Sequence, residues 1–385
     1  MRKLKMGMVG GGQGAFIGHI HRMAIALNGE IQLVCGVFSK DAAVSRASGR
    51  ELGLAPSRCY DGYREMLATE ASLPAGERID LVAIVTPNAS HFEIARMALQ
   101  YGFHVMCEKP LTLTLAEARE LRALAARHER QFAVAHAYAG YPMVVQARQL
   151  VSDGAIGTVQ KVVVDYVQGW LAEAVLAQRP QSQSQTENWR LDPAQGGAAG
   201  CLGDIAIHAA HLAELVSGQA ISTVLADLAS IGQGRQLDDD VAILLRFGNG
   251  ARGMLNASQV CVGEENHLTL RVYGSQGSLH WAQQAPDTLA LDRAGQPRLS
   301  LSSGQPYLCD AARAMGRTPS GHPQGYIEAF ANLYRWFYHS MCGTGSTDAL
   351  PGMAAGVRGM AFIEAALRSN AQGNRWAAIE AEVAA

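Results

Sequence analysis

The run Met6-Gly7-Met8-Val9-Gly10-Gly11-Gly12-Gln13-Gly14-Ala15-Phe16-Ile17-Gly18 is a short apolar strand that leads directly into a glycine-rich turn. A diphosphate is bound best by backbone N–H groups that no Cβ shields and that the N-terminus of a helix presents. Gly10 and Gly12 fit the first two positions of G-x-G-x-x-G, and Ala15 is an accepted substitute at the third. The turn therefore predicts a dinucleotide site, and the residues expected to line it are Gly10, Gly12, Gln13, Ala15, Phe16 and Ile17.

The next segments complete a β-α-β unit around this turn. Residues 19–27 have the pattern of a helix, and residues 31–38 form a second apolar strand. At the end of that strand an acidic residue would bind the ribose hydroxyls of NAD, whereas a cation or a hydroxyl suits the phosphate of NADP. Ser39 and Lys40 stand there, followed by Asp41. The expected cofactor is NAD or NADP: Ser39 and Lys40 favour NADP, and Asp41 keeps NAD open.

The composition is that of a compact protein with two cores. A chain of 385 residues, with 48% hydrophobic and 17% charged residues, can bury the cores of two domains. The formal net charge is −2 and Lys and Arg are not clustered, so we expect no nucleic-acid partner. The sequence has neither an apolar run of about 18 residues nor a signal-peptide pattern, so we expect no membrane segment and a cytoplasmic location. Seven cysteines without a C-x-x-C pair indicate neither a disulfide framework nor a thiolate zinc site.

Further strands of the buried type alternate with helical patterns. The strands are residues 79–85, 103–107 and 131–135, and the helices are residues 92–101 and 114–128. This alternation predicts a parallel, doubly wound sheet of the Rossmann type. Ligands of such sheets lie beyond the carboxyl ends of the strands. Gly10, Ser39, Thr86 and Lys109 all follow strand ends, so we expect them to converge at one edge.

Two sets of polar side chains lie near the expected nucleotide site. Lys109, in Glu108-Lys109-Pro110, is the first candidate for a catalytic residue. An ammonium at the mouth of a nucleotide crevice polarises a carbonyl or hydroxyl and stabilises a developing alkoxide. His19 and His21 follow the glycine-rich turn and face apart on a helix. We therefore expect them to cap the helix or to contact phosphate rather than to bind a metal.

A second glycine-rich segment, residues 196–203, precedes Asp204, His208 and His211. If residues 204–216 are helical, Asp204 and His208 share a face at i and i+4, with His211 one turn further on. An imidazole suits proton transfer near neutral pH, and a neighbouring carboxylate fixes its tautomer and raises its basicity. The same three side chains could instead bind a catalytic metal. Three ligands from one helix are an unusual geometry, so we expect no metal site.

The ordered motifs resemble those of the Gfo/Idh/MocA oxidoreductases. They are the glycine-rich turn, Thr86-Pro87-Asn88-x-x-His91 and Glu108-Lys109-Pro110; beyond residue 215 the resemblance rests on architecture. It implies that cofactor contacts come from Thr86, Pro87, Asn88, His91, Glu108 and Lys109. It also implies that Lys109 contacts both the nicotinamide and the reacting hydroxyl, and that the Lys109–Pro110 bond is commonly cis. For Asp204 and His208 it implies roles in orienting the substrate and moving its proton.

The residues expected to bind substrate depart from the family pattern. Many members carry an Asn-Tyr-Arg run where this chain has Ala137-Tyr138-Ala139, so Tyr138 keeps its hydroxyl without the polar neighbours. Trp189 and Arg190 are expected to replace those neighbours. A tryptophan face suits the C–H surface of a sugar, and an arginine binds hydroxyls or a carboxylate. The expected substrate-binding residues are Tyr138, Trp189, Arg190 and His211.

The chain is expected to form a Rossmann domain at 1–136 and an α+β domain at 137–385. Strand-length runs in the second domain are residues 159–167, 224–231, 241–247, 251–260, 268–273 and 278–281, with a hairpin signal at 247–250. They predict one mostly antiparallel open sheet. Its uncovered apolar face predicts a homodimer or homotetramer. Surface excursions are expected at 179–187 and 285–318, and late helices at 326–341 and 353–369, of which the last could pack back on the first domain.

These features predict an NAD(P)-dependent oxidoreductase. Hydride would pass between the nicotinamide and a secondary alcohol or ketone of a sugar, cyclic polyol or sugar derivative. Lys109 would polarise the oxygen, and His208, braced by Asp204, would relay the proton. One alternative is a nucleotide-sensing protein on the same fold, against which the retention of all three residues argues. Another is a transferase-like enzyme that holds NAD tightly without net redox change.

Overall fold

The computed structural model describes residues 2–178, 188–345 and 350–380. The surface excursion predicted at 179–187 lies outside these residues. The chain divides into two compact units. The first unit comprises residues 1–137 and 330–357, and the second comprises residues 138–329 and 358–385. The predicted domains, 1–136 and 137–385, differ from these units in assigning 330–357 to the second part.

The first unit is built on a five-stranded parallel sheet in the order β2-β1-β3-β4-β5. Its strands are β1 (Leu4–Gly10), β2 (Ile31–Val37), β3 (Leu81–Val85), β4 (His104–Cys107) and β5 (Phe132–Val134). Every residue of the central strand β3 is buried, as expected of a parallel sheet covered on both faces. The predicted doubly wound parallel sheet is confirmed.

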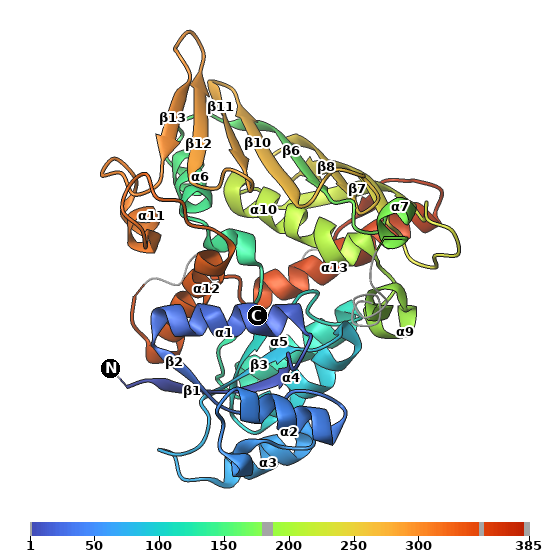
Figure 1. The fold of residues 1–385 in the computed structure, drawn as a ribbon. Helices are drawn as coiled ribbons and strands as arrows, with labels where there is room; N and C mark the ends of the chain where they lie inside the picture. The colour runs from blue at the N-terminus through green and yellow to red at the C-terminus, as the bar shows by residue number, and fades with distance from the viewer. Residues whose placement is uncertain (1, 179–187, 346–349, 381–385) are drawn as a thin grey trace. The chain divides into compact units, whose positions relative to one another are not determined.

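Helices connect these strands in the order of a β-α-β fold (Figure 1). They are α1 (Phe16–Asn28), α2 (Ala42–Glu51), α3 (Tyr63–Ser72), α4 (His91–Gln100) and α5 (Leu115–Arg127), with short 3-10 turns η1 (Pro56–Arg58) and η2 (Asn88–Ser90). The start of α5 is set by a capping box, in which Thr114 Oγ1 accepts from the Glu117 N–H and the Glu117 carboxylate accepts from the Thr114 N–H.

The second unit contains a nine-stranded sheet in the order β13-β12-β11-β10-β6-β9-β8-β7-β14. The strands are β6 (Val159–Val167), β7 (Ile221–Ala229), β8 (Asp240–Phe247), β9 (Arg252–Ser258), β10 (His267–Gly274), β11 (Gly277–Ala282), β12 (Thr288–Arg293), β13 (Leu299–Ser302) and β14 (Ala377–Ala378). Strand β6 pairs with β9 in parallel, and the other pairs are antiparallel. The predicted mostly antiparallel sheet and the hairpin between β8 and β9 are confirmed.

The prediction of a surface excursion at 285–318 is wrong, because this stretch adds strands β12 and β13 to the sheet. Leu289 and Leu291 alternate with more exposed residues on β12 and are buried. This alternation is the pattern of a strand with one buried face. The alternation spans only a few residues among turn-forming residues, so the run resembled a loop.

Helices α6 and α10 pack against the sheet of the second unit. The helical segments here are η3 (Ala137–Gly140), α6 (Pro142–Ser152), α7 (Glu173–Leu176), η4 (Asn188–Leu191), α9 (Pro193–Gly196), the π-helical turn η5 (Leu202–Ala206), α10 (Ile207–Ser217) and α11 (Asp310–Met315). The late helices α12 (Tyr326–Cys342) and α13 (Met353–Ala371) contribute residues to both units.

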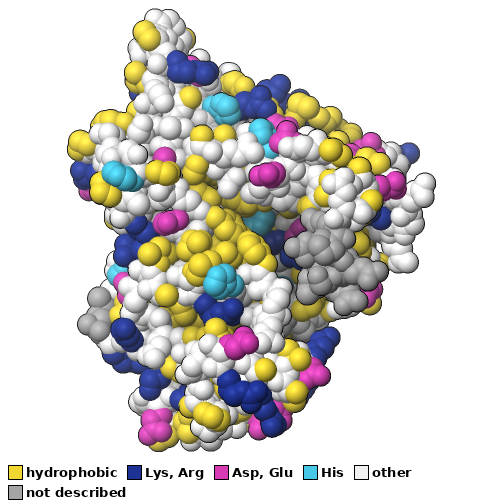
Figure 2. Space-filling model, in the orientation of Figure 1, with side chains coloured by type: hydrophobic (Ala, Val, Ile, Leu, Met, Phe, Trp, Pro, Cys, Tyr) yellow, Lys and Arg dark blue, Asp and Glu magenta, His cyan; other side chains and the backbone are white. Residues whose placement is uncertain are grey.

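The surface carries charges of both signs. On the face drawn in Figure 2, basic and acidic side chains of the described residues are interspersed. Along β8 and β9 buried and exposed residues alternate, and the exposed side chains include Leu244 and Met254. Within the described parts of the chain, no helix is long and apolar enough to cross a membrane.

Candidate active site

The glycine-rich turn is shaped so that only glycine fits at two of its predicted positions. Gly10 has φ +90°, and a Cβ on it would lie 2.6 Å from the Val85 carbonyl oxygen. A Cβ on Gly12 would lie 2.6 Å from the Phe38 carbonyl oxygen, to which the Gly12 N–H donates at 3.2 Å. Glycine is therefore required at both positions, because the turn packs closely against the backbone at Val85 and Phe38.

Helix α1 starts at the turn with its N-terminal N–H groups uncapped by a side chain. Ala15 is the N-cap residue, and the first turn of α1 has no acidic residue. Phe16, at the first helical position, is 69% exposed, and Ile17 is half-buried. Uncapped N–H groups at a helix N-terminus that follows a glycine-rich turn suit a diphosphate, so these residues fit a dinucleotide.

Two residues that sequence reasoning missed support the turn from behind. A Cβ on Gly18, within α1, would lie 2.3 Å from Gly11 Cα, so the closest approach between helix and turn is made here. Arg22 donates from Nη1 to the Gly11 carbonyl at 2.6 Å, and burial lowers the pKa of its guanidinium. A glycine inside a helical pattern was the available signal for Gly18.

The residues after β2 bear on the choice of cofactor. Ser39 is half-buried and Lys40 is exposed. Asp41 is the N-cap of α2: its Oδ1 accepts from the Ala43 N–H at 2.8 Å and from the Val44 N–H at 3.0 Å. The predicted alternative role of Asp41 in binding ribose therefore competes with helix capping.

Gln13 lies at the exposed rim of the turn. Its N–H donates to Ser48 Oγ at 3.1 Å, and its side-chain amide donates to the Glu51 carboxylate. Both partners are on α2, so Gln13 connects the glycine-rich turn with the helix that Asp41 caps.

One buried histidine connects the ends of β3 and β4. His91 Nε2 lies 2.9 Å from the Thr86 carbonyl oxygen, and His91 Nδ1 lies 2.9 Å from the Pro110 carbonyl oxygen. Burial lowers the pKa of His91. The Thr86 Oγ1 accepts from Ser90 Oγ at 2.7 Å, and Asn88 is buried in the same turn. The Thr86-Pro87-Asn88 turn and the Lys109–Pro110 segment are thus held by the same side chain.

Lys109 is half-buried at the carboxyl end of β4, and its peptide bond to Pro110 is cis, as the resemblance implied. The Lys109 N–H donates to Glu108 Oε2 at 3.2 Å. Glu108 is buried, and its other oxygen meets His21 Nε2 at 3.0 Å. The expectation that His21 caps a helix or contacts phosphate is therefore wrong, because its ring is fully buried behind the turn. His19 is exposed.

In the second unit, Asp204 lies in the π-helical turn η5 that precedes α10. Its Oδ2 accepts from Gln259 Nε2 at 2.8 Å, and its Oδ1 lies 3.7 Å from Arg190 Nε. The turn is anchored by Asp238, whose two carboxylate oxygens accept from the Gly200 and Leu202 N–H groups at 2.7 Å each. Single π-helical turns of this kind are frequent at functional sites.

Tyr138 and His208 are brought together as a T-shaped pair with ring centroids 5.1 Å apart. The Tyr138 hydroxyl bonds to that of Tyr166 and accepts from Asn266 Nδ2 at 3.2 Å. Tyr166 in turn donates to Asn266 Oδ1 at 2.8 Å. Burial raises the pKa of both tyrosines, so both hydroxyls stay protonated. Tyr166 and Asn266 were missed; a tyrosine on the buried face of an otherwise valine-rich strand was the signal for Tyr166.

The other predicted substrate-binding residues lie near Asp204 or further along α10. The Arg190 guanidinium stacks on the Trp189 ring, 4.5 Å from its centroid. His211 is on α10, and burial lowers its pKa to about 4. Among the residues that the structure describes, no group of three or more His, Cys, Asp or Glu side chains is arranged to hold a metal ion.

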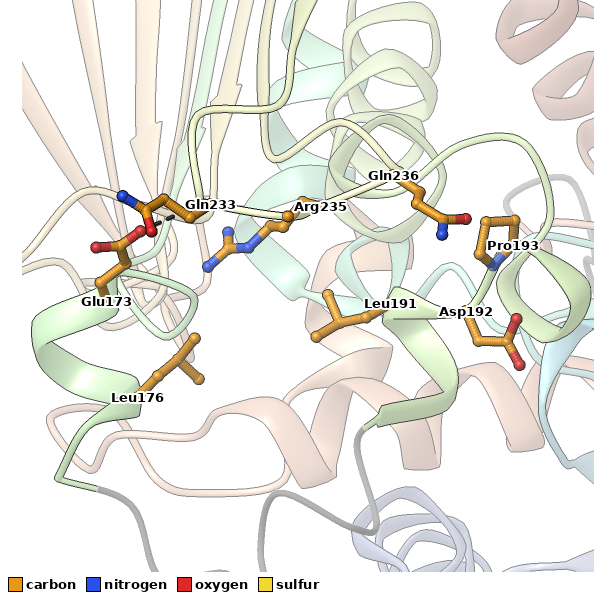
Figure 3. A pocket seen from close by; sticks show the side chains of 9 residues that line it. Glu173, Leu176, Leu191, Asp192, Pro193, Gln233, Arg235 and Gln236 are labelled. Atoms are coloured by element: carbon orange, nitrogen blue, oxygen red, sulfur yellow. Dashed lines mark hydrogen bonds between the residues drawn. The ribbon is translucent and has the colours of Figure 1, made fainter.

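A separate pocket of about 490 Å³ is a poor candidate for the active site. It lies in the second unit and is lined by Glu173, Leu176, Leu191, Asp192, Pro193, Gln233, Gly234, Arg235 and Gln236 (Figure 3). Its charged groups already have structural partners: Arg235 pairs with Asp239, Glu173 accepts from the Gln233 N–H, and Asp192 caps α9.

Comparisons with known proteins agree with this description. Residues 4–136 match a family described as an oxidoreductase family with an NAD-binding Rossmann fold, and residues 144–280 match the GFO/IDH/MocA C-terminal domain. The oxidoreductase YfiI of Bacillus subtilis is 34% identical over 97% of this chain and 96% of its own length. Levoglucosan dehydrogenase of Pseudarthrobacter phenanthrenivorans is 28% identical over 80% of this chain and 82% of its own.

Solved structures show the same architecture. An inositol dehydrogenase homologue from Azotobacter vinelandii, in complex with NAD+, is 35% identical with a TM-score of 0.92 over 98% of this chain and 97% of its own. Its complex with NADH and myo-inositol is 33% identical with a TM-score of 0.90, and covers 98% of each chain. The chain described here therefore belongs to the Gfo/Idh/MocA family of NAD-binding oxidoreductases.

Proposed function

We propose that the protein is a dehydrogenase that transfers hydride between a nicotinamide cofactor and a secondary alcohol or ketone of a sugar or cyclic polyol. The observation that carries the proposal is the meeting of three predicted elements at one sheet edge. Gly10 pairs with Val85 at the ends of β1 and β3, and Ile84 pairs with Cys107 near the ends of β3 and β4. The glycine-rich turn and Thr86 come directly after β1 and β3, and Lys109 is two residues after Cys107, so all three share the edge where ligands of such sheets bind.

In this proposal the glycine-rich turn and the N-terminus of α1 hold the diphosphate, and the loops after β3 and β4 hold the nicotinamide side. The bound nicotinamide supplies or accepts the hydride. Lys109 polarises the reacting oxygen and stabilises negative charge on it. His208 carries the proton, with Asp204 as its orienting carboxylate.

The substrate class rests on two supports. Relatives of this chain bear the names levoglucosan dehydrogenase and inositol dehydrogenase homologue. In the second unit, the hydroxyls of Tyr138 and Tyr166, the Asn266 amide and the Trp189–Arg190 pair offer the hydrogen-bonding groups and the flat apolar face that a polyhydroxylated ring requires. We propose that these residues bind the substrate. We also propose an oligomer formed through the exposed face of the nine-stranded sheet.

The proposal is tested by following nicotinamide absorbance with a panel of inositols, anhydrosugars and aldoses, each with NAD and with NADP. The wild type is expected to turn over at least one ring polyol. Lys109→Met is expected to lower kcat by about 100-fold or more while NADH still binds, because it removes the charge that stabilises the alkoxide. Lys3→Met, an exposed lysine in the same unit, serves as the matched control. Cofactor binding without turnover of any substrate would contradict the proposal and favour a nucleotide sensor.

A further inference from the structure

Three buried polar side chains from distant parts of the chain are hydrogen-bonded in series, and the last of them directly precedes Lys109. His21 on α1 and Tyr334 on α12 are fully buried, and Glu108, which directly follows β4, is also buried. His21 Nδ1 lies 2.6 Å from Tyr334 Oη, and His21 Nε2 lies 3.0 Å from Glu108 Oε1. The Phe330 ring packs on His21 with centroids 5.0 Å apart, which keeps this line in an apolar surrounding.

The direction of these hydrogen bonds follows from the partners. Burial opposes ionisation of Glu108, but bonding to His21 and the nearby charge of Lys109 bring the pKa of this carboxyl below its ordinary value. An ionised carboxylate only accepts, so His21 Nε2 donates to it. Burial and the negative charge of Glu108 raise the pKa of Tyr334 well above its ordinary value. The Tyr334 hydroxyl is therefore protonated and is able to donate to His21 Nδ1.

A buried carboxylate costs stability, and an apolar core of the same volume is often equally stable or more so. The position of Glu108 suggests what the arrangement achieves. Its second oxygen accepts from the Lys109 N–H at 3.2 Å, so the carboxylate that His21 holds is bonded to the backbone of the proposed catalytic residue. Besides His21 and Lys109, the titratable groups close enough for the Glu108 charge to affect their pKa are His91, Cys107 and Tyr334.

We propose that His21 and Tyr334 are positioning residues for Lys109. They fix the Glu108 carboxylate so that it orients the Lys109 backbone and places a negative charge one residue from the Lys109 ammonium. The inference rests on the proposed role of Lys109, and it adds a connection between the late helix α12 and the chemistry at the carboxyl end of β4. Neither His21 nor Tyr334 contacts the reacting atoms in this scheme.

The test compares Tyr334→Phe and His21→Gln with the matched control Tyr338→Phe. Tyr338 lies one turn further along α12 and is also buried, but its hydroxyl donates to the Arg2 carbonyl at 3.2 Å, away from Glu108. With a substrate found in the panel above, Tyr334→Phe and His21→Gln are expected to lower kcat by about 10- to 100-fold and to shift the pH profile of kcat/KM. NADH binding is expected to stay within about twofold, since the glycine-rich turn is unchanged. Tyr338→Phe is expected to leave both quantities unchanged.

A second readout does not need turnover. Competitive acetylation at one pH, followed by mass spectrometry, compares the reactivity of Lys109 with that of other lysines in the protein without cofactor. In Tyr334→Phe and His21→Gln the relative reactivity of Lys109 is expected to rise about threefold, because a displaced carboxylate no longer fixes the backbone that carries the ammonium. Lys40 in the same samples, and Lys109 in Tyr338→Phe, are expected to keep their wild-type reactivity. Unchanged Lys109 reactivity in folded Tyr334→Phe would overturn the inference, whereas absence of turnover in the wild type would count only against the proposed function.

Discussion

At the scale of single residues, His91 shows how one side chain can hold two loops of a binding edge together. Its two ring nitrogens each face a carbonyl oxygen, of Thr86 and of Pro110, at 2.9 Å. A neutral imidazole has one N–H and can donate to only one of them, and burial lowers the pKa of His91, so the ring is kept neutral. The ring therefore donates to one carbonyl and packs against the other, and in this way it sets the spacing of the Thr86 and Lys109 segments.

The residues after β2 lead to a prediction on cofactor choice. Asp41 accepts hydrogen bonds from two N–H groups of its own helix, so its carboxylate is occupied and is less able to bind the ribose hydroxyls of NAD. We therefore expect Lys40 to favour NADP by pairing with the ribose phosphate. Lys40→Ala should weaken NADPH binding about tenfold and leave NADH binding within about twofold. Titration of nicotinamide fluorescence measures both constants, with Lys3→Ala as the control for loss of an exposed charge. If Lys40→Ala weakened the binding of NADH and NADPH equally, Lys40 would not be the residue that recognises the phosphate.

At the scale of elements, the junction between β4 and β5 depends on a neutral histidine. His104 Nδ1 accepts from the Gln131 N–H at 2.9 Å, and protonation of that nitrogen would remove the acceptor. Burial, and to a lesser extent the charge of Arg130, lower the pKa of His104 to about 4. An unfolded histidine titrates near 6.5, so below that pH the unfolded chain takes up a proton that the folded one does not.

We therefore predict that the stability contribution of His104 is complete above pH 6.5 and is lost as the pH falls toward 4. The loss should amount to roughly 1–2 kcal/mol, less than the full shift implies because the ring is partly exposed. Urea unfolding at a series of pH values, together with hydrogen exchange of residues 104–107 and 131–134, measures it. His104→Gln keeps an acceptor and should flatten the pH dependence. An unchanged slope in this variant would assign the acid sensitivity to other groups.

The π-helical turn that carries Asp204 depends on a cap supplied by another segment. Asp238 accepts from the Gly200 and Leu202 N–H groups, and a Cβ on Gly200 would lie 2.2 Å from the Asp238 carbonyl oxygen. Removing the carboxylate leaves two N–H groups without this acceptor. Asp238→Ala should therefore lower the free energy of unfolding by about 1–3 kcal/mol and speed hydrogen exchange over residues 200–208.

The control for this prediction is Asp192→Ala, which removes the half-buried cap of the short helix α9. It should cost less, and it should not alter exchange over residues 200–208. If the two variants behave alike in that segment, the cap at Asp238 is not what holds the Asp204 turn.

At the scale of the whole molecule, the exposed face of the nine-stranded sheet is the surface through which we expect copies of the chain to associate. Leu244 and Met254 are direct partners on β8 and β9, and they are 44% and 48% exposed. Apolar side chains paired on a sheet face are typical of an interface between copies.

We predict that Leu244→Glu with Met254→Glu converts the oligomer to a monomer, because opposed carboxylates on both copies would repel and require desolvation. Light scattering after size exclusion measures the mass in solution. Ile231→Glu with Val262→Glu is the matched control, since these exposed apolar residues lie outside strands β8 and β9. A wild type that is monomeric at micromolar concentration would contradict the prediction directly.

Much of the fold could be predicted because its determinants are local. The buried run of β3, the glycine pattern of the first turn and the Gly-Asn-Gly hairpin after β8 each lie within a few consecutive residues. The strand-end positions of Thr86 and Lys109 follow from the same patterns, because parallel strands deliver their carboxyl ends to one edge. The error at β12 and β13 arose where edge strands are short and their burial depends on neighbours in the sheet.

The sequence by itself determined that this is a dinucleotide-binding α/β protein with a lysine at the carboxyl edge of its parallel sheet. Only the tertiary structure decided how its buried polar groups pair. His21 and Tyr334 are 313 residues apart, and Asp204 and Gln259 are 55 apart, so no spacing rule relates them. The physical reason is that a polar group removed from water needs a hydrogen-bond partner inside the protein. The packing of distant segments determines which side chain becomes that partner.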